Sequence, residues 1–180
     1  MPTNPNTQGA TDRIVASWLK KSGISREKIV IATKVAGPGI TWLPGRNGEN
    51  SRVREKDIIV SVDESLKRLG VDYIDLLQIH WPDRYVPIFG QSVYNRTLER
   101  DSTPFEEQIV VLNKLIKAGK VRQIGLSNET PFGIMKFSAI TEKLGLQPFV
   151  SLQNSYRYTC ILRHFLLYAD FLFLFIQCYM

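Results

Sequence analysis

The chain has 180 residues and a mass of 20.6 kDa, the size of a single domain with one hydrophobic core, and its 44% apolar and 22% charged residues exclude disorder throughout and fibrous repeats. The formal charge is +6, but the 23 basic residues are interleaved with 17 acidic ones, whereas a nucleic-acid-binding protein gathers its basic residues into a stripe. We therefore expect no nucleic-acid partner and a mildly basic surface that favours a small anionic ligand.

Cysteines and histidines are few and far apart. Cys160 and Cys178 both lie in the last fifth of the chain, so they predict neither a disulfide framework nor a zinc site, and a reducing compartment is the default. His80 and His164 lack the spacing of a metalloprotease motif, so we expect no bound metal. Residues 1–7 resemble neither a signal peptide nor a transit peptide, which makes the cytoplasm the default location; a plastid location requires a longer parent with a transit peptide.

Helices and strands are predicted to alternate along the chain. Apolar residues three and four positions apart predict the helices, short β-branched runs predict the strands, and glycine or proline marks their ends. In chain order we predict a helix over 11–22, a strand over 28–34, a helix over 54–69, a strand over 73–80, a helix that begins at Pro104 and is ended by Gly119, a strand over 121–126, a helix capped by Asn128 with Pro131 in its first turn, and a strand over 149–153.

This alternation predicts an α/β fold. Strands that alternate with helices form a parallel sheet through right-handed crossovers. Two long loops, over residues 36–51 and 81–103, each follow the carboxyl end of a predicted strand. Because α/β folds gather their functional groups at that end of the sheet, we expect the functional site there.

The last segment, residues 158–180, departs from this pattern because it is apolar on every side. Arg163, His164 and Asp170 interrupt the apolar run, whereas a membrane helix needs on the order of 18 apolar residues in succession. We rank a tail foreign to the fold first, a buried core helix second and a weak membrane anchor third. Because a solvent-facing helix needs a polar stripe, we also expect this tail to lower solubility.

Motifs that cradle nucleotide phosphates are absent from the sequence. No Gly-x-Gly-x-x-Gly follows a predicted strand, no Gly-Lys-Ser/Thr is present, and residues 37–39 (GPG) form a short turn without a following helix. The sequence also has no Gly-x-Ser-x-Gly nucleophile elbow. A doubly wound dinucleotide-binding fold and a P-loop NTPase are therefore disfavoured.

Polar residues follow each of the four predicted strands. They are Lys34 after the first, His80 after the second, Ser127 and Asn128 after the third, and Gln153 and Asn154 after the fourth. Taken singly, Lys34 is typical of a strand-end lysine that reaches solvent, and His80 is typical of a hydrogen-bonded core histidine. In a parallel barrel, however, all four strand ends face one mouth, so the whole set favours a functional site.

Four segments are similar to successive signatures of the aldo-keto reductase family. They are 31–34 (IATK), 65–83 (SLKRLGVDYIDLLQIHWPD), 119–128 (GKVRQIGLSN) and 151–154 (SLQN). Residues 128–130 (NET) and 6–12 (NTQGATD) resemble the family's Tas-like bacterial and plant branch. The resemblance runs over residues 2–157 and covers the family's third to sixth strands. It implies a (βα)8 TIM barrel that binds NADPH without a Rossmann glycine motif and reduces aldehydes or ketones by hydride transfer.

The resemblance also implies roles for the strand-end residues. Lys34 is similar to the family lysine whose ammonium lowers the pKa of a tyrosine, the proton donor to the substrate carbonyl. His80 is similar to the histidine that orients this carbonyl and donates a hydrogen bond to its oxygen. The residues that match the family's nicotinamide-carboxamide ligands are Ser127, Asn128 and Gln153. Trp81 resembles a wall of the substrate pocket, with simple packing on the rim as the alternative.

The resemblance is incomplete at both ends. The family's catalytic aspartate and tyrosine stand before the segment that begins here at Met1, and its last two strands, with the phosphate-binding loops, would follow residue 157. We therefore expect a truncated, partial TIM barrel of about four parallel strands with flanking helices over 1–157, an atypical tail over 158–180, and impaired or absent activity. The alternative is a non-catalytic regulatory or binding protein, since some aldo-keto reductases resemble potassium-channel β subunits.

Overall fold

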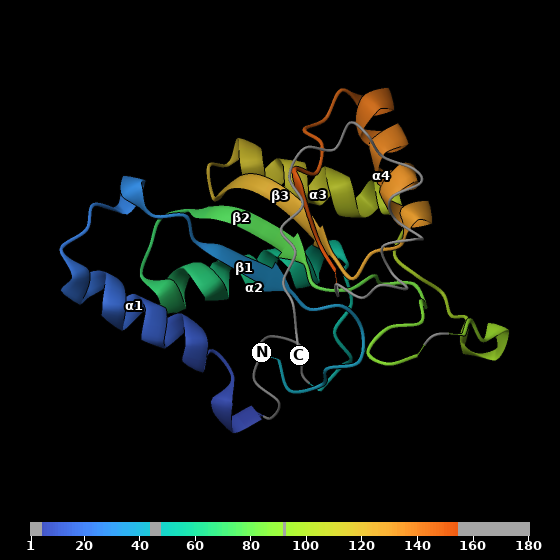
Figure 1. Ribbon diagram of the computed structural model, residues 1–180, viewed down its shortest axis with the longest axis horizontal. Helices are drawn as coiled ribbons and strands as arrows, with labels where there is room; N and C mark the ends of the chain where they lie inside the picture. Colours follow the sequence, from blue (N-terminus) through green and yellow to red (C-terminus); the bar gives the residue numbers. More distant parts are fainter. Residues whose placement is uncertain (1–4, 44–47, 92, 155–180) are drawn as a thin grey trace.

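The computed structural model describes residues 5–43, 48–91 and 93–154. The predicted tail over 158–180 and the domain limit at residue 157 lie outside these ranges. Within them, helices and strands alternate as predicted, and the strands form one sheet with helices along one side (Figure 1). The α/β class, with parallel strands and flanking helices, is confirmed.

The strands of the described chain are β1 (Ala32–Val35), β2 (Ile74–Ile79), β3 (Val121–Ser127) and β4 (Ser151–Gln153). Its α-helices are α1 (Ala10–Ser22), α2 (Glu55–Leu69), α3 (Phe105–Lys117) and α4 (Pro131–Leu144), and its short 3-10 turns are η1 (Pro5–Thr7), η2 (Arg26–Lys28) and η3 (Arg96–Leu98). The strands pair in the order β1-β2-β3-β4, and each pairing is parallel. Their carboxyl ends therefore lie at one edge, where the long loops after β1 and β2 begin (Figure 1).

The start of α4 differs from its prediction. Pro131 occupies the first turn as expected, but the cap is Thr130, whose side-chain oxygen accepts from the Gly133 amide at 3.3 Å. The prediction that Asn128 caps this helix is wrong. Asn128 has a φ of 51°, and its side chain donates to the His80 carbonyl after β2 and to the Ser127 hydroxyl, so the cap stands two residues further on.

The first strand is shorter and less buried than predicted. The prediction covered residues 28–34, but β1 begins at Ala32, because the Ile31 amide donates to the Asp75 carboxylate at 2.9 Å rather than to a neighbouring strand. Only Val35 is fully buried within β1. The prediction of a buried strand is wrong because β1 lies at the edge of the described sheet.

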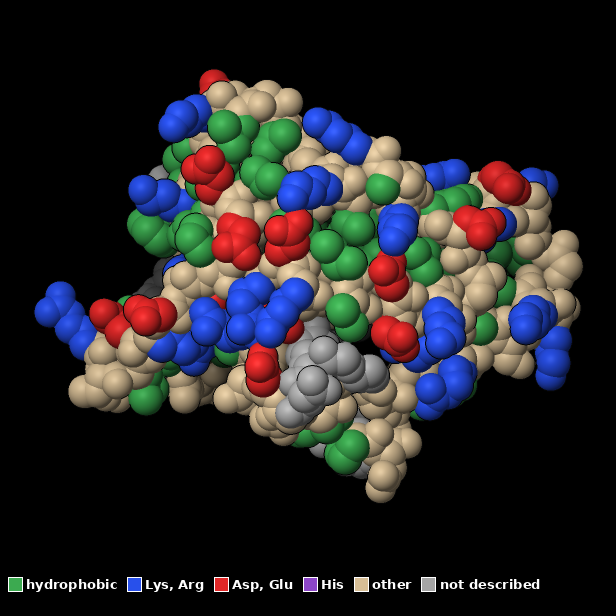
Figure 2. Space-filling view, turned by 180° about the vertical axis from the view of Figure 1, so that it is seen from behind, with side chains coloured by type: hydrophobic (Ala, Val, Ile, Leu, Met, Phe, Trp, Pro, Cys, Tyr) green, Lys and Arg blue, Asp and Glu red, His purple; other side chains and the backbone are tan. Residues whose placement is uncertain are grey.

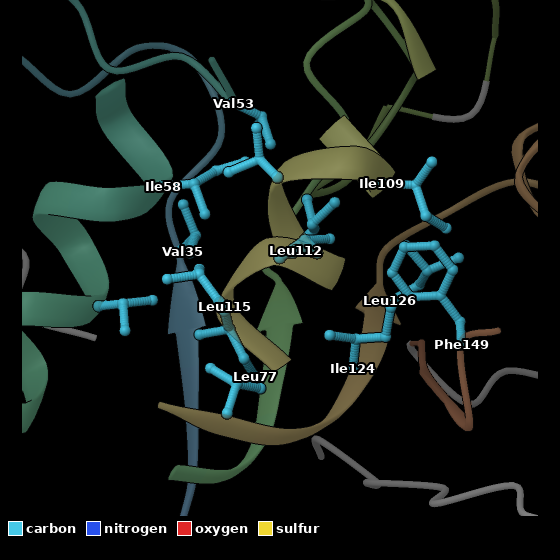
Figure 3. Close-up of a cluster of buried hydrophobic side chains, with 14 of the residues drawn as sticks. Val35, Val53, Ile58, Leu77, Ile109, Leu112, Leu115, Ile124, Leu126 and Phe149 are labelled. Atoms are coloured by element: carbon cyan, nitrogen blue, oxygen red, sulfur yellow. The ribbon is translucent and has the colours of Figure 1, made fainter. Parts of the chain in front are cut away.

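The hydrophobic core lies between the sheet and helices α2, α3 and α4 (Figure 3). Its main strand residues are Val35, Leu77, Ile79, Ile124 and Leu126, and its main helix residues are Ile58, Val62, Ile109, Leu112, Leu115 and Phe137. Full burial of an aliphatic side chain of this size contributes about 1.5–3 kcal/mol. This face of the sheet therefore supplies most of the packing that holds the helices in place.

The other face of the sheet carries a mostly polar row of residues at its carboxyl edge. Side chains alternate along a strand, so the residues between the core positions point away from the helices. Lys34 pairs in register with Gln78, Gln78 with Gly125, and Gly125 with Ser151, which places the four in one row across the sheet. A Cβ atom on Gly125 would collide with the Ser151 hydroxyl, so the glycine allows its neighbours to pack over it.

The outer surface mixes charges of both signs. Basic and acidic side chains are interspersed over the face seen in Figure 2, with apolar side chains between them. Helix α1 packs beside α2, to which the Arg68–Asp12 ion pair joins it at 2.8 Å, but its Ile14 and Trp18 side chains are half-exposed or more. Among the described residues, no helix is both long and apolar enough to cross a membrane.

Candidate active site

Hydrogen bonds join the carboxyl ends of all four strands. His80, directly after β2, donates its amide to the Val35 carbonyl of β1 at 2.8 Å, which places it close to Lys34. Asn128, directly after β3, donates its amide to the Gln153 carbonyl of β4 at 3.0 Å. The predicted residues that meet at this edge are Lys34, His80, Ser127, Asn128 and Gln153.

Asn128 links the carboxyl ends of β2 and β3. Its φ of 51° lies in the left-handed region, which asparagine tolerates better than most residues. Its side-chain Nδ2 donates to the His80 carbonyl at 2.8 Å and to the Ser127 Oγ at 3.2 Å. Both amide hydrogens are therefore used within the protein, while the Asn128 Oδ1 keeps acceptor capacity and the Ser127 hydroxyl keeps its hydrogen to donate.

Lys34 and His80 form an electrostatically coupled pair. Burial lowers the pKa of Lys34 below its ordinary value. Burial, and then the positive charge of Lys34, lower the pKa of His80 from 6.5 to about 4. His80 is therefore neutral at physiological pH, so one of its ring nitrogens carries a hydrogen to donate and the other accepts.

Trp81 lies beneath the loop that follows β1. Its side chain is 9% exposed, its Nε1 donates to the Pro38 carbonyl at 3.1 Å, and its ring centroid lies 4.6 Å from that of His80. A Cβ atom on Gly37 would collide with the indole, so the loop needs glycine at this close approach. The structure thus shows Trp81 packed within the protein against His80, and its role as a pocket wall stays a prediction.

The sequence profile of the Aldo/keto reductase family matches residues 7–165. The chain belongs to the aldo-keto reductase family. It is 40% identical over 156 residues to Protein tas of Escherichia coli (strain K12), an alignment that covers 87% of this chain and 44% of that protein. It is also 40% identical over 142 residues to an aldo-keto reductase of Babesia bovis, covering 74% of this chain and 49% of the relative. The chain spans less than half the length of these relatives.

A solved aldo-keto reductase shares the arrangement of strands and helices. A thermostable member, crystallised with the inhibitor epalrestat, is similar with a TM-score of 0.59 and 25% identity, over 82% of this chain and 41% of that one. The described elements therefore form part of the aldo-keto reductase TIM barrel.

The residues at the end of β3 fit the cofactor class of the family. Aldo-keto reductases typically use NAD(P)H, whose nicotinamide carries a primary carboxamide with an acceptor oxygen and two donor hydrogens. The Ser127 hydroxyl can donate and the Asn128 Oδ1 can accept, which are the two kinds of group that a carboxamide needs. Within the described ranges, no three His, Cys, Asp or Glu side chains cluster as metal ligands would.

Two buried carboxylates beside this candidate site were not predicted from the sequence. Asp83 accepts hydrogen bonds from Arg52, and Glu129 accepts from both terminal nitrogens of Arg84 at 3.0 and 2.5 Å. Both carboxylates are almost completely buried. Their partners lie 31 and 45 positions away in the sequence, so no local pattern could have identified the pairs.

Proposed function

We propose that this chain carries the lysine–histidine pair and the nicotinamide-binding edge of an NADPH-dependent carbonyl reductase. The main support is the arrangement at one edge of the sheet: His80, whose pKa is lowered to about 4 by burial and by the charge of Lys34, lies at the same edge as the Ser127 hydroxyl and the Asn128 side chain. The substrates proposed are small aldehydes or ketones, the class that the family implies.

In this proposal His80 acts as a hydrogen-bond donor. A neutral imidazole with a pKa of about 4 keeps its ring hydrogen at neutral pH and donates it as a hydrogen bond to a carbonyl oxygen. Negative charge grows on that oxygen during reduction, and a fixed donor in a partly buried position stabilises it more than water would. Bound reduced nicotinamide supplies the hydride.

Lys34 supplies the positive charge of the pair. By the family resemblance, this charge acts on a tyrosine that gives the proton, and neither that tyrosine nor its aspartate partner is matched in this chain. We therefore propose that Lys34 and His80 are part of an acid–base set that these 180 residues do not complete. Reductase turnover at the rate of a full-length homologue would then need the tyrosine that donates the proton.

A turnover measurement tests whether the acid–base set is incomplete. We expect NADPH-dependent reduction of a small aldehyde by this chain to be about 10²–10⁴-fold slower than that by a full-length homologue, because one member of the acid–base set is lacking. The decrease of NADPH absorbance measures it. Turnover within tenfold of the homologue, abolished by Lys34→Met, would contradict the proposal. Cofactor binding without turnover would instead leave the regulatory alternative open.

Cofactor binding tests the nicotinamide edge. We expect NADPH to bind with a Kd on the order of 1 mM or weaker, because only nicotinamide-end contacts are proposed and no charge-assisted phosphate contacts. In an NMR titration, the amide signals of Ser127, Asn128 and Gln153 should shift. Ser127→Ala should weaken binding at least threefold, whereas the control Ser102→Ala, in an exposed loop, should not. Micromolar binding, or shifts only elsewhere, would contradict this arrangement.

A further inference from the structure

Asp83 is a buried carboxylate near the site that accepts hydrogen bonds through both of its oxygens. It is 1% exposed and receives four donors on its two oxygens. Oδ1 accepts from the Arg52 Nε at 2.9 Å and from the Val53 amide at 2.8 Å. Oδ2 accepts from the Arg52 Nη2 at 2.7 Å and from the Thr103 amide at 2.6 Å.

The hydrogen bonds to Asp83 hold the ends of both long loops together. Arg52 and Val53 end the loop that follows β1, whereas Asp83 begins and Thr103 ends the loop that follows β2. The Arg52 Nη2 also donates to the Asp101 carbonyl at 2.9 Å. The two loops begin at the arrowheads of β1 and β2 in Figure 1. The Asp83 carboxylate joins the ends of these loops.

The ionised form of Asp83 suits this position. Burial alone would raise the pKa of Asp83, but the hydrogen bonds from Arg52 and from the Thr103 and Val53 amides outweigh it and lower the pKa. A charged and neutralised carboxylate gives stronger hydrogen bonds than a neutral side chain of the same shape. Removing one partner of such a buried ion pair leaves the charge of the other partner buried without a counter-charge.

The two joined loops meet at the contact between the Trp81 and His80 rings. Trp81 follows His80 directly, and its indole is held from above by Gly37 and by the Pro38 carbonyl, which belong to the other loop. If the loops separated, Trp81 would lose this cover and His80 would lose the ring that lies against it. The Trp81 ring covers part of His80, whose burial is the first cause of its lowered pKa.

We propose that Asp83 is a positioning residue of the candidate active site, which joins the loops after β1 and β2 and thereby holds Trp81 and His80 in place at the strand ends. The inference rests on the proposed function for the role of His80. Asp83 itself touches neither a substrate nor a cofactor in this proposal. Its effect passes through the loop pairing and the Trp81 contact.

The test follows the ring titration of His80 by NMR in the full 180-residue chain, with the His80 signal assigned by its loss in His80→Gln. In Asp83→Asn, the pKa of His80 should rise by at least one unit from about 4 toward 6.5, because the ring becomes exposed. Arg52→Lys, which keeps the charge but loses the paired donor geometry, should give a smaller rise. The control Asp101→Asn removes an exposed carboxylate from the same loop and should leave the titration unchanged.

Limited trypsin digestion separates positioning from simple loop stability. Faster cleavage in the two loops of Asp83→Asn together with a raised pKa of His80 supports the proposal. Faster cleavage with an unchanged pKa shows that Asp83 only stabilises the loops, and overturns it. If Asp83→Asn does not fold, Arg52→Lys decides by the same two measurements. The titration needs no cofactor, so its result can be read whatever the turnover and NADPH measurements show about the proposed function.

Discussion

The two faces of the sheet carry different kinds of side chain. The face toward α2, α3 and α4 carries aliphatic side chains such as Leu77 and Ile124, which interlock with the helices and exclude water. The face that points away carries Lys34, Gln78 and Ser151, with Gly125 between them. Neighbouring positions along the same strand therefore serve different ends: one packs the domain, and the next presents polar groups.

This contrast teaches where a change should affect stability and where it should affect the site. A substitution on the helix face leaves a cavity, whose cost depends on the volume removed. On the polar face, the cost depends on close approach and on which hydrogen bonds are lost.

The largest effect is expected from Ile124→Ala on the helix face. Ile124 is fully buried in the main core, so the truncation should lower the free energy of unfolding by about 2–5 kcal/mol. Urea unfolding followed by circular dichroism measures it. The matched control is Ile14→Ala on α1, a mostly exposed isoleucine, which should change stability by no more than about 0.5 kcal/mol. Equal losses in the two variants would remove the distinction between core and surface.

A smaller effect is expected from Gly125→Ala, one position further along β3. The new methyl group would collide with the Ser151 hydroxyl and crowd the Gln78 side chain, which overpacks the polar face at a cost of about 1–3 kcal/mol. Thermal and urea unfolding measure the loss.

The second-site variant Ser151→Ala makes this prediction specific. The Ser151 hydroxyl is buried with no hydrogen-bond partner in the described chain, so its removal alone should be close to neutral. In the double variant, Gly125→Ala should lose less stability than it does alone. A double variant as unstable as the sum of its parts would show that the collision is not the cause.

The smallest effect is a pH dependence contributed by His80. Its pKa is about 4 when folded and near 6.5 when unfolded, so the unfolded chain takes up a proton first as pH falls. Stability should therefore be full above about pH 6.5 and decline toward pH 4, by about 1 kcal/mol between pH 7 and pH 5.5. Comparing the unfolding of the native chain and of His80→Gln at both pH values isolates this contribution. Identical slopes would mean that His80 is not held neutral by burial.

Local pattern predicted most of the fold because the forces that make helices and strands act over a few residues. The spacing of apolar residues and the glycines after helices located all four described α-helices. The polar residues Lys34, His80, Ser127 and Gln153 lie together at the carboxyl edge of the sheet, as predicted. Parallel topology then followed, since a helix between two strands returns the chain to the same end.

The errors arose where a distant side chain replaced a local backbone partner. Asp75 takes the Ile31 amide and delays the start of β1, and the bonds of Asn128 to His80 and Ser127 leave the capping of α4 to Thr130. Asp75 lies 44 positions from Ile31, and His80 lies 48 positions from Asn128, so no short window of sequence contains either pair.

The sequence by itself therefore determined the order of the elements, the polar strand ends and the family signatures, because these depend on residue type and short spacing. Only the tertiary structure decided which groups meet. It pairs Asp83 with Arg52 across two loops, places Trp81 under Gly37, and lets burial together with the charge of Lys34 keep His80 neutral. Hydrogen bonding, close packing and desolvation depend on distances in space, and those exist only once the four strands lie side by side.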